Sequence, residues 1–192
     1  MEESLNQFFG LDMRSVITVR DVGWALFGLG AVAVFWQIDK RKGAEAVARR
    51  GALGYFVIWL QYFFGIHALF SGANYFLNPE RQMVLTHELT GPFQAALDAL
   101  GLFAVVKVIE TVVGLCLILN IFVPLAAIFE MPVSVVIFYL SVIVDPDQRS
   151  IWTGSKELII NVVLLLAYFG YFRPIFRLKL EWRPIWRKFG AE

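Results

Sequence analysis

Two opposite charges lie three residues apart in one of the most apolar stretches of the chain, VVKVIETVVG at residues 105–114. Side chains at positions i and i+3 of a helix share a face, so Lys107 and Glu110 can form an ion pair with each other. A charged side chain in the middle of a membrane span costs about 2.5–3.5 kcal/mol, so such residues face a partner or a cavity. A buried carboxylate can carry protons, and a buried lysine can hold an anionic or carbonyl oxygen.

A second polar stripe occurs in GIHALFSGANYF, where His67, Ser71 and Asn74 are separated by four and three residues. This is the spacing of one helical face. At about 1.5 Å per residue from the outer ends of the predicted spans, His67 and Glu110 lie about 15 Å deep, and Ser71 and Lys107 lie about 9–10 Å deep. We therefore expect the two stripes to meet in one buried cluster in the outer half of the membrane.

Further polar residues border this predicted cluster. Glu130 lies in the inner half of another apolar run, two residues before Pro132, which can kink a helix and free a carbonyl. Asn161 lies one turn below Glu157, which we expect near the exterior interface together with Lys156, where long side chains reach the headgroups. The predicted buried polar cluster comprises His67, Ser71, Asn74, Lys107, Glu110, Glu130 and Asn161, with His67, Lys107 and Glu110 as the catalytic candidates.

The chain has few residues that could bind a metal or a haem, and this limits the cofactors it could hold. The single cysteine, Cys116, excludes an intramolecular disulfide, a CxxC redox pair and a cysteine-ligated cluster. His87 lies in a predicted exterior loop, which argues against a bis-histidine haem, and His67 with Glu110 lacks a third ligand for a metal. We predict no metal, and quinone or lipid is the ligand class that stays open. The cluster is either a structural polar network or a site for protons or a quinone headgroup.

The elements that must position these residues are membrane-spanning helices. The chain of 192 residues is 58% hydrophobic and only 17% charged, and its mean hydropathy of +0.65 is that of a polytopic membrane protein. Apolar runs long enough to cross about 30 Å of hydrocarbon lie at about 22–38, 53–77, 100–119, 123–144 and 155–172. The third and fourth runs are separated only by NIFVP, which predicts an antiparallel hairpin.

The distribution of basic residues predicts the orientation in the membrane. Two clusters fall on the same side of a five-span bundle: Lys40, Arg41, Lys42, Arg49 and Arg50 after the first span, and Arg173, Arg177, Lys179, Arg183, Arg187 and Lys188 in the tail. The positive-inside rule makes that side cytoplasmic. We expect a bacterial inner-membrane protein with a cytoplasmic C-terminus and, with five spans, an exterior N-terminus.

Three regions follow from this reading. Residues 1–50 form an N-terminal segment with one predicted span and a basic loop, residues 51–172 form a four-helix bundle, and residues 173–192 form a basic, aromatic tail. The tail contains the near-repeat RPIFR and RPIWR and is expected to lie at the headgroups of the cytoplasmic leaflet. The segment 79–99 is expected to be the longest exterior connection, suited to a lid or a partner contact.

Part of the sequence resembles the DoxX and DoxX-like membrane proteins. The stretch VVKVIETVVGLCLILNIFVPLAAIFEMPVSVVIFYL is similar to the core hairpin of that family, and LQYFFGIHALFSGANYFLNP is similar to its first helix. The resemblance covers about residues 53–172 and implies a four-helix membrane bundle, to which this chain adds an N-terminal helix. One departure is the stretch FYLSVIVDPDQRS, which lacks a histidine that many DoxX-like sequences place there.

Two main functions and a third are compatible with these features. The leading expectation is an accessory or scaffold subunit of a larger bacterial electron-transfer complex, respiratory or photosynthetic, that is not catalytic by itself. The alternative is a quinone-linked oxidoreductase subunit with a buried proton-transfer or quinone-headgroup site. The DoxX family takes its name from a subunit associated with a thiosulfate:quinone oxidoreductase. The resemblance therefore implies a quinone-linked setting for both expectations. A small-solute transporter ranks third, because the sequence shows no inverted repeat or pair of broken helices. The partners expected are lipid and other membrane subunits, and no nucleic acid.

Overall fold

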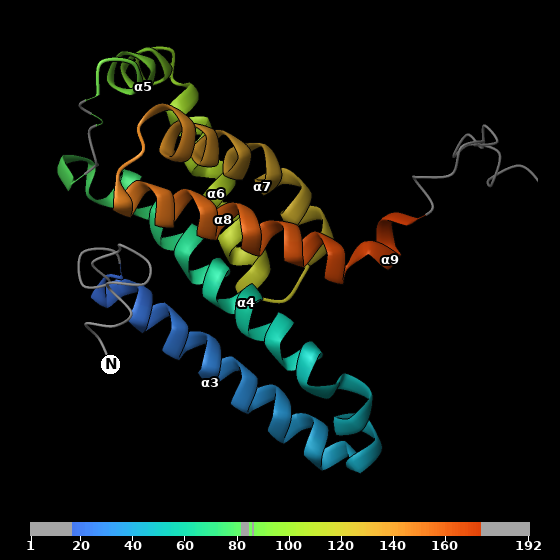
Figure 1. Cartoon of the computed structure of the whole chain (residues 1–192). Coiled ribbons are helices and arrows are strands. Elements are labelled where there is room, and N and C mark those ends of the chain that lie inside the picture. Colours follow the sequence, from blue (N-terminus) through green and yellow to red (C-terminus); the bar gives the residue numbers. More distant parts are fainter. Residues whose placement is uncertain (1–16, 82–84, 86, 174–192) are drawn as a thin grey trace, which may run out of the picture.

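The computed structural model describes residues 17–81, 85 and 87–173, and within them it is built from helices and their connections with no strand (Figure 1). This confirms the predicted all-α class. The helical elements are α3 (Val19–Lys42), α4 (Ala44–Leu77), η1 (Pro79–Arg81), α5 (Thr90–Ala99), α6 (Leu102–Ile118), α7 (Val123–Phe138), η2 (Tyr139–Val144), α8 (Gln148–Ala167) and α9 (Phe169–Phe172). The predicted C-terminal tail lies almost wholly outside the described residues.

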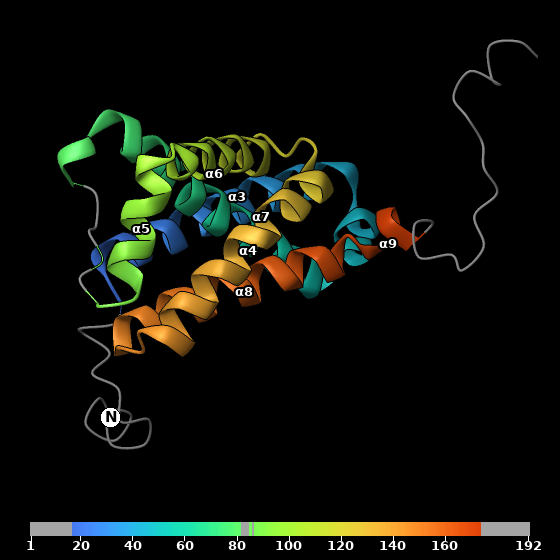
Figure 2. The same cartoon turned by 90° about the horizontal axis from the view of Figure 1, so that it is seen from above.

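Helices α3 and α4 form a long antiparallel pair. A capping box starts α3: the Thr18 hydroxyl accepts from the Asp21 N–H at 3.3 Å, and the Asp21 carboxylate accepts from the Thr18 N–H at 3.0 Å. The helix ends at Gly43, whose φ of 115° suits glycine and turns the chain back. The two helices lie side by side along most of their length in both views (Figures 1 and 2). At 24 residues, α3 is longer than the predicted run 22–38.

The remaining helices pack on the other side of α4. The predicted hairpin at NIFVP is present, because α6 and α7 are joined through Asn120 and Phe122, which both adopt positive φ angles of 55° and 50°. Helix α7 continues into the π-helical turn η2, and Asp147 caps the start of α8. Helix α8 therefore begins at Gln148 instead of near residue 155.

The segment 79–99 is not only a connection. It contains η1 and the ten-residue helix α5, which meets α6 at an angle of 87° (Figure 2). The sequence predicted only a connection here, although the segment contains Gly91 and Pro92 within a helix. Both residues lie in the first turn of α5, where proline is tolerated because the first N–H groups of a helix have no partner within it.

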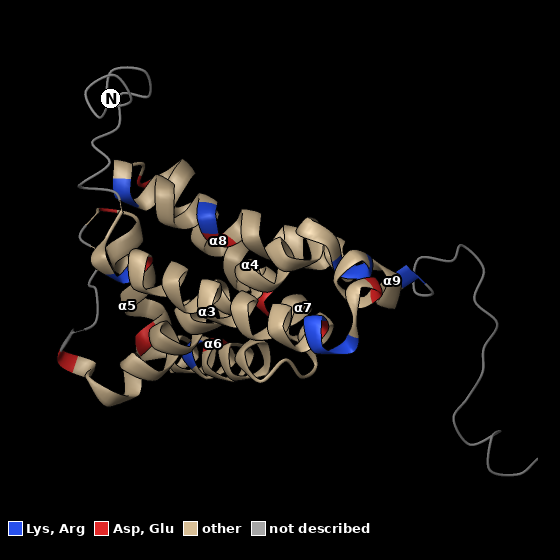
Figure 3. Ribbon diagram, turned by 90° about the horizontal axis from the view of Figure 1, so that it is seen from below, with Lys and Arg blue, Asp and Glu red and all other residues tan. Residues whose placement is uncertain are grey.

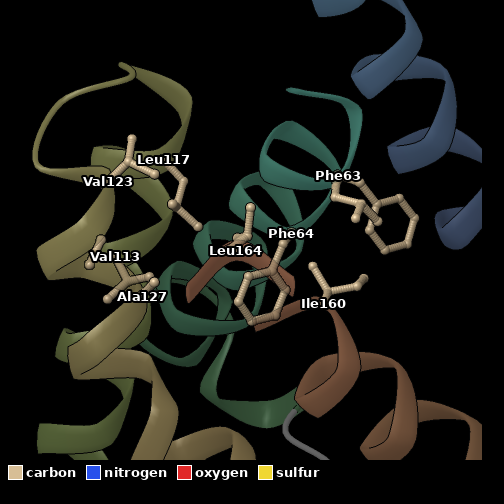
Figure 4. Close-up of a cluster of buried hydrophobic side chains, with 10 residues drawn as sticks. Phe63, Phe64, Val113, Leu117, Val123, Ala127, Ile160 and Leu164 are labelled. Atoms are coloured by element: carbon tan, nitrogen blue, oxygen red, sulfur yellow. The ribbon is translucent and has the colours of Figure 1, made fainter. Parts of the chain in front are cut away.

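The core lies where α4, α6, α7 and α8 meet. Phe64, Leu117 and Leu164 are at most 1% exposed and come from three different helices (Figure 4). Helices α4 and α6 approach closely through glycines: a Cβ added at Gly114 would lie 2.3 Å from the backbone nitrogen of Leu69. This close approach brings the polar side chains of α4 and α6 within hydrogen-bonding distance.

The outer surface of the bundle is rich in apolar side chains. Four helical stretches are long and apolar enough to cross a membrane, and a fifth span results if α5 and α6 count as one bent element. Large apolar residues such as Leu26, Phe129 and Ile159 are 62%, 57% and 61% exposed. In water such a surface would be unfavourable, whereas lipid tails solvate it. The chain is therefore a multi-pass membrane protein.

Candidate functional site

The ammonium group of Lys107 makes three hydrogen bonds within the predicted cluster. Its Nζ donates to Glu110 Oε1 at 2.9 Å, to Glu110 Oε2 at 2.8 Å and to Ser71 Oγ at 3.0 Å. Lys107 is 9% exposed and Glu110 is 3% exposed. The predicted i, i+3 ion pair and its contact with the polar stripe of α4 are both confirmed.

His67 pairs with a different helix from the one expected. Its Nε2 lies 2.7 Å from Glu157 Oε1 on α8, and not against Glu110 on α6. Glu157 is 6% exposed, so it lies inside the bundle and not at the interface where it was predicted. The predicted depth match with Glu110 is wrong. Gly114 of α6 lies against Leu69, and Gly72 of α4 lies against Thr111, so His67 is closer to the level of Gly114 than to that of Glu110.

Aromatic rings enclose the His67 imidazole. Phe64 stacks nearly parallel to it at 6.2 Å between ring centroids, and Trp24 of α3 meets it edge-on at 4.6 Å. His67 Nδ1 is buried and has no hydrogen-bond partner in the described part of the chain. When Nε2–H donates to Glu157, the Nδ1 lone pair is therefore free to accept a proton.

Glu130 of α7 is the least satisfied charged residue of the site. It is 3% exposed, and its Oε2 has no hydrogen-bond partner among the described residues. It lies within electrostatic range of Glu110, Glu157 and Lys107, so α7 brings a third carboxyl group to the other two. We call the group formed by His67, Lys107, Glu110, Glu130 and Glu157 the carboxylate centre.

A neighbouring ion pair connects the carboxylate centre to α3. Lys156 Nζ donates to Asp21 Oδ1 at 2.6 Å and lies 5.6 Å from the centre of the Trp24 ring. The Lys156 side chain is only 8% exposed, so the predicted snorkelling to the interface is wrong. Sequence reasoning missed Asp21 because it precedes the apolar run, although Thr18 three residues earlier is the signature of a capped helix start.

Three predicted members are not part of the carboxylate centre: Ser71, which contacts it through Lys107, and Asn161 and Asn74. Asn161 of α8 is fully buried and contacts α7: with its amide oriented to satisfy both atoms, its nitrogen donates to the Ala127 carbonyl at 3.0 Å, and its oxygen accepts from Ser134 Oγ at 3.1 Å and from the Met131 N–H at 3.0 Å. Asn161 therefore fixes α8 against α7 next to Glu130. The side chain of Asn74 accepts from Asn78 at 2.9 Å near the end of α4, and Asn74 does not join the cluster.

A second polar group lies nearer the α6–α7 turn, and the sequence did not reveal it. Gln61 Nε2 donates to the Leu117 carbonyl at 2.8 Å and to Asn120 Oδ1 at 3.0 Å, while the Tyr168 hydroxyl donates to Gln61 Oε1 at 2.8 Å. Gln61 is 1% exposed. We call Gln61, Asn120 and Tyr168 the amide cluster. Its members are uncharged and lie far apart in the sequence, so no spacing pattern marks them.

The described residues contain no group of three or more His, Cys, Asp or Glu side chains placed to hold a metal ion. Comparison of the chain with protein-family models, with curated proteins and with solved structures finds no match. A function for this protein must therefore be inferred from the residues of the carboxylate centre.

Proposed function

We propose that this protein binds and transfers protons as a subunit of a bacterial quinone-linked electron-transfer complex. The observation that supports this is the composition of the carboxylate centre. Three buried carboxyl groups, Glu110, Glu130 and Glu157, surround one ammonium group and one imidazole inside a membrane bundle. We place the protein in the inner membrane with its C-terminus in the cytoplasm, following the distribution of basic residues.

The charge balance of the centre requires protons. With Lys107 charged and His67 neutral, three ionised carboxylates would leave two uncompensated negative charges in a region of low dielectric. Unpaired buried charges cost several kcal/mol each, and groups in such places bind protons instead. Glu130 accepts the first proton because its Oε2 is buried without a hydrogen-bond partner among the described residues. The second adds to His67 Nδ1 and creates an imidazolium that pairs with Glu157.

The geometry gives each residue a separate task. Glu110 holds Lys107 in place, and the two together carry no net charge. Glu157 orients the imidazole through Nε2 and stabilises its charged form, which leaves Nδ1 as the atom that gains and loses a proton. Reduction of a quinone takes up two electrons and two protons. The centre supplies or receives protons, and the electrons come from redox groups of other subunits.

The resemblance to DoxX proteins supports the quinone-linked setting, because that family is named after a subunit associated with a thiosulfate:quinone oxidoreductase. The stretches that resemble the family include His67, Lys107, Glu110 and Glu130, which are four of the five residues of the carboxylate centre. The contact of His67 with Glu157 is an additional ground that the resemblance does not contain.

The proposal is tested by infrared spectroscopy of the full chain in lipid nanodiscs. At neutral pH we expect the carbonyl stretch of a protonated carboxyl group, shifted in D₂O, and its loss in Glu130→Gln. The matched control is Glu45→Gln, which removes an exposed carboxylate at the start of α4 and should leave the band unchanged. Absence of any protonated carboxyl band in the folded wild-type protein would refute proton binding at this centre.

The leading expectation from the sequence, an accessory subunit without its own chemistry, is favoured by one feature of α6. Its exposed residues Val105, Val108, Val112, Leu115 and Leu119 recur at alternating spacings of three and four. This is the spacing of a seam between two helices. Purification in mild detergent tests it: Val112→Trp should lose co-purifying subunits, whereas Ile159→Trp on the exposed face of α8 should keep them. A wild-type protein that purifies alone contradicts this second function.

A further inference from the structure

The turn between α3 and α4 combines a hollow with a surplus of positive charge. A shallow, open surface hollow of about 450 Å³ is lined by Trp36, Gln37, Lys40 and Arg41, all on the last turns of α3. It lies at the opposite end of α3 from Asp21, about 28 Å away along the helix. The hollow is therefore separate from the carboxylate centre, and Figure 3 looks onto the turn and shows its blue basic segments.

The acidic residue nearest the hollow is already neutralised. Asp39 is 3% exposed and accepts hydrogen bonds from Arg50 Nε, from Arg50 Nη2 at 3.2 Å and from the Tyr55 hydroxyl at 3.1 Å. Because Arg50 and Asp39 cancel, the local charge is set by Lys40, Arg41, Lys42 and Arg49 against Glu45. None of these four basic side chains takes part in the ion pairs shown for the described residues. The turn thus presents a net positive charge to its surroundings.

The position of the hollow places it in the headgroup layer of a bilayer. Helix α3 has 24 residues and is about 36 Å long, which exceeds the hydrocarbon thickness of about 30 Å. At least one end of α3 therefore emerges from the hydrocarbon, and its basic last turn, with Lys40 and Arg41, is the end that water and headgroups solvate best. Trp36 is 44% exposed, and Lys40 Nζ lies 5.0 Å from the centre of its ring. An exposed tryptophan next to a lysine is typical of the membrane interface.

The same face of α3 continues into the membrane as an apolar strip. Leu26 and Leu29 are 62% and 54% exposed, and they share the helical face of Trp36 and Lys40 by their spacing. A molecule with an anionic head and apolar tails matches this surface from end to end. A free anion would use only the charged end, because it has nothing to place against Leu29.

We infer that the hollow at the end of α3 binds the headgroup of an anionic phospholipid, with Lys40 and Arg41 on the phosphate and the acyl chains along Leu29 and Leu26. The guanidinium of Arg41 can bind two phosphate oxygens at once, and the indole N–H of Trp36 is available to the glycerol region. This inference does not depend on proton binding at the carboxylate centre.

Native mass spectrometry of the full chain in mild detergent tests the inference, with phosphatidylglycerol or phosphatidylethanolamine added at equal concentration. We expect phosphatidylglycerol to be retained and phosphatidylethanolamine to be lost. The double variant Lys40→Gln, Arg41→Gln should weaken phosphatidylglycerol binding about thirtyfold, since each basic residue at an anionic lipid surface contributes about 1 kcal/mol. Both side chains are exposed, so the variant is expected to fold.

The matched control removes two exposed positive charges elsewhere, Arg20→Gln with Arg149→Gln. It should change binding by less than about threefold, because it leaves the hollow intact. An equal loss in both double variants would show attraction by overall charge and would overturn the site. Equal retention of the two lipids would also overturn it, as would displacement of phosphatidylglycerol by millimolar inorganic phosphate, which would identify a site for a free anion.

Discussion

The carboxylate centre and the amide cluster are both polar groups inside one apolar bundle, and they differ in how completely their atoms are paired. In the amide cluster, the Gln61 nitrogen and oxygen both have partners, and no member is charged. In the carboxylate centre, His67 Nδ1 and Glu130 Oε2 are buried without a partner in the described chain. A satisfied neutral network holds helices together, whereas unpaired titratable atoms are where protons bind.

The position of the two groups supports the same distinction. Gln61 joins α4 to the α6–α7 turn and, through Tyr168, to the end of α8, so it fixes three parts of the bundle. The carboxylate centre also joins α4 to α6 and α8, but it does so through groups whose charge can change. The amide cluster therefore holds helices together with groups of fixed charge, whereas we propose that the carboxylate centre both holds helices together and binds protons.

The largest expected effect comes from breaking the ion pair of the carboxylate centre. Glu110→Ala leaves the Lys107 ammonium buried with Ser71 as its remaining partner, which we expect to lower the free energy of unfolding by about 3–5 kcal/mol. Titration with a denaturing detergent, followed by circular dichroism, measures this loss. The control is Lys107→Met combined with Glu110→Leu, which removes both charges and should restore most of the stability. A double variant as unstable as the single one would contradict the pairing argument.

A smaller effect is expected from the amide cluster. Gln61→Leu leaves the Leu117 carbonyl, the Asn120 side chain and the Tyr168 hydroxyl without their partner, so we expect a loss of about 1–3 kcal/mol. The same unfolding titration measures it, and Gln61→Leu with Tyr168→Phe should recover part of the loss. The infrared carboxyl band should stay as in the wild type. A change in that band would show that the two groups are coupled and would remove the distinction between them.

The sequence predicts well what depends on position along a helix. Four of the five apolar runs located helices long enough to cross a membrane, and the run 100–119 located the shorter helix α6. Asn120 and Pro124 located the hairpin, and the i, i+3 spacing gave the Lys107–Glu110 pair. Each of these features is local, so the chain itself determines it.

Features that depend on the position of one helix against another could not be predicted. His67 contacts Glu157 and not Glu110. Gly72 lies against Thr111 and Gly114 lies against Leu69, so Glu110 and His67 are at different levels of the α4–α6 contact. The contribution of α3 was hidden for a similar reason: Asp21 gains its importance only from Lys156, which lies far away in the sequence. Such contacts are set by tertiary packing, which no single periodicity contains.

The smallest predicted effect concerns Asp147, an exposed carboxylate that belongs to neither group. It caps α8 by accepting from the N–H groups of Arg149 at 2.9 Å and Ser150 at 3.1 Å and from the Ser150 hydroxyl. Asp147→Ala should lower the free energy of unfolding by about 0.5–2 kcal/mol, which the same titration measures. Asp147→Asn, which keeps an acceptor at the cap, should lose much less.

The Asp147 cap also makes the free energy of unfolding depend on pH, and this contribution must be separated from that of the carboxylate centre. The hydrogen bond from the Ser150 hydroxyl, helped by the two backbone N–H groups, lowers the pKa of Asp147 below its usual value of 3.8. A carboxyl group with a lowered pKa in the folded state stabilises the fold fully above its unfolded-state pKa, and this stabilisation is lost as the pH falls through the folded-state value. The contribution of Asp147 is therefore constant at neutral pH and disappears only in strong acid. Asp147→Asn should flatten this acid limb and leave any pH dependence near neutrality intact. If the free energy of unfolding still depends on pH near neutrality in Asp147→Asn, but not in Glu130→Gln, that dependence belongs to the carboxylate centre. If the dependence is lost in Asp147→Asn, it belongs to the helix cap.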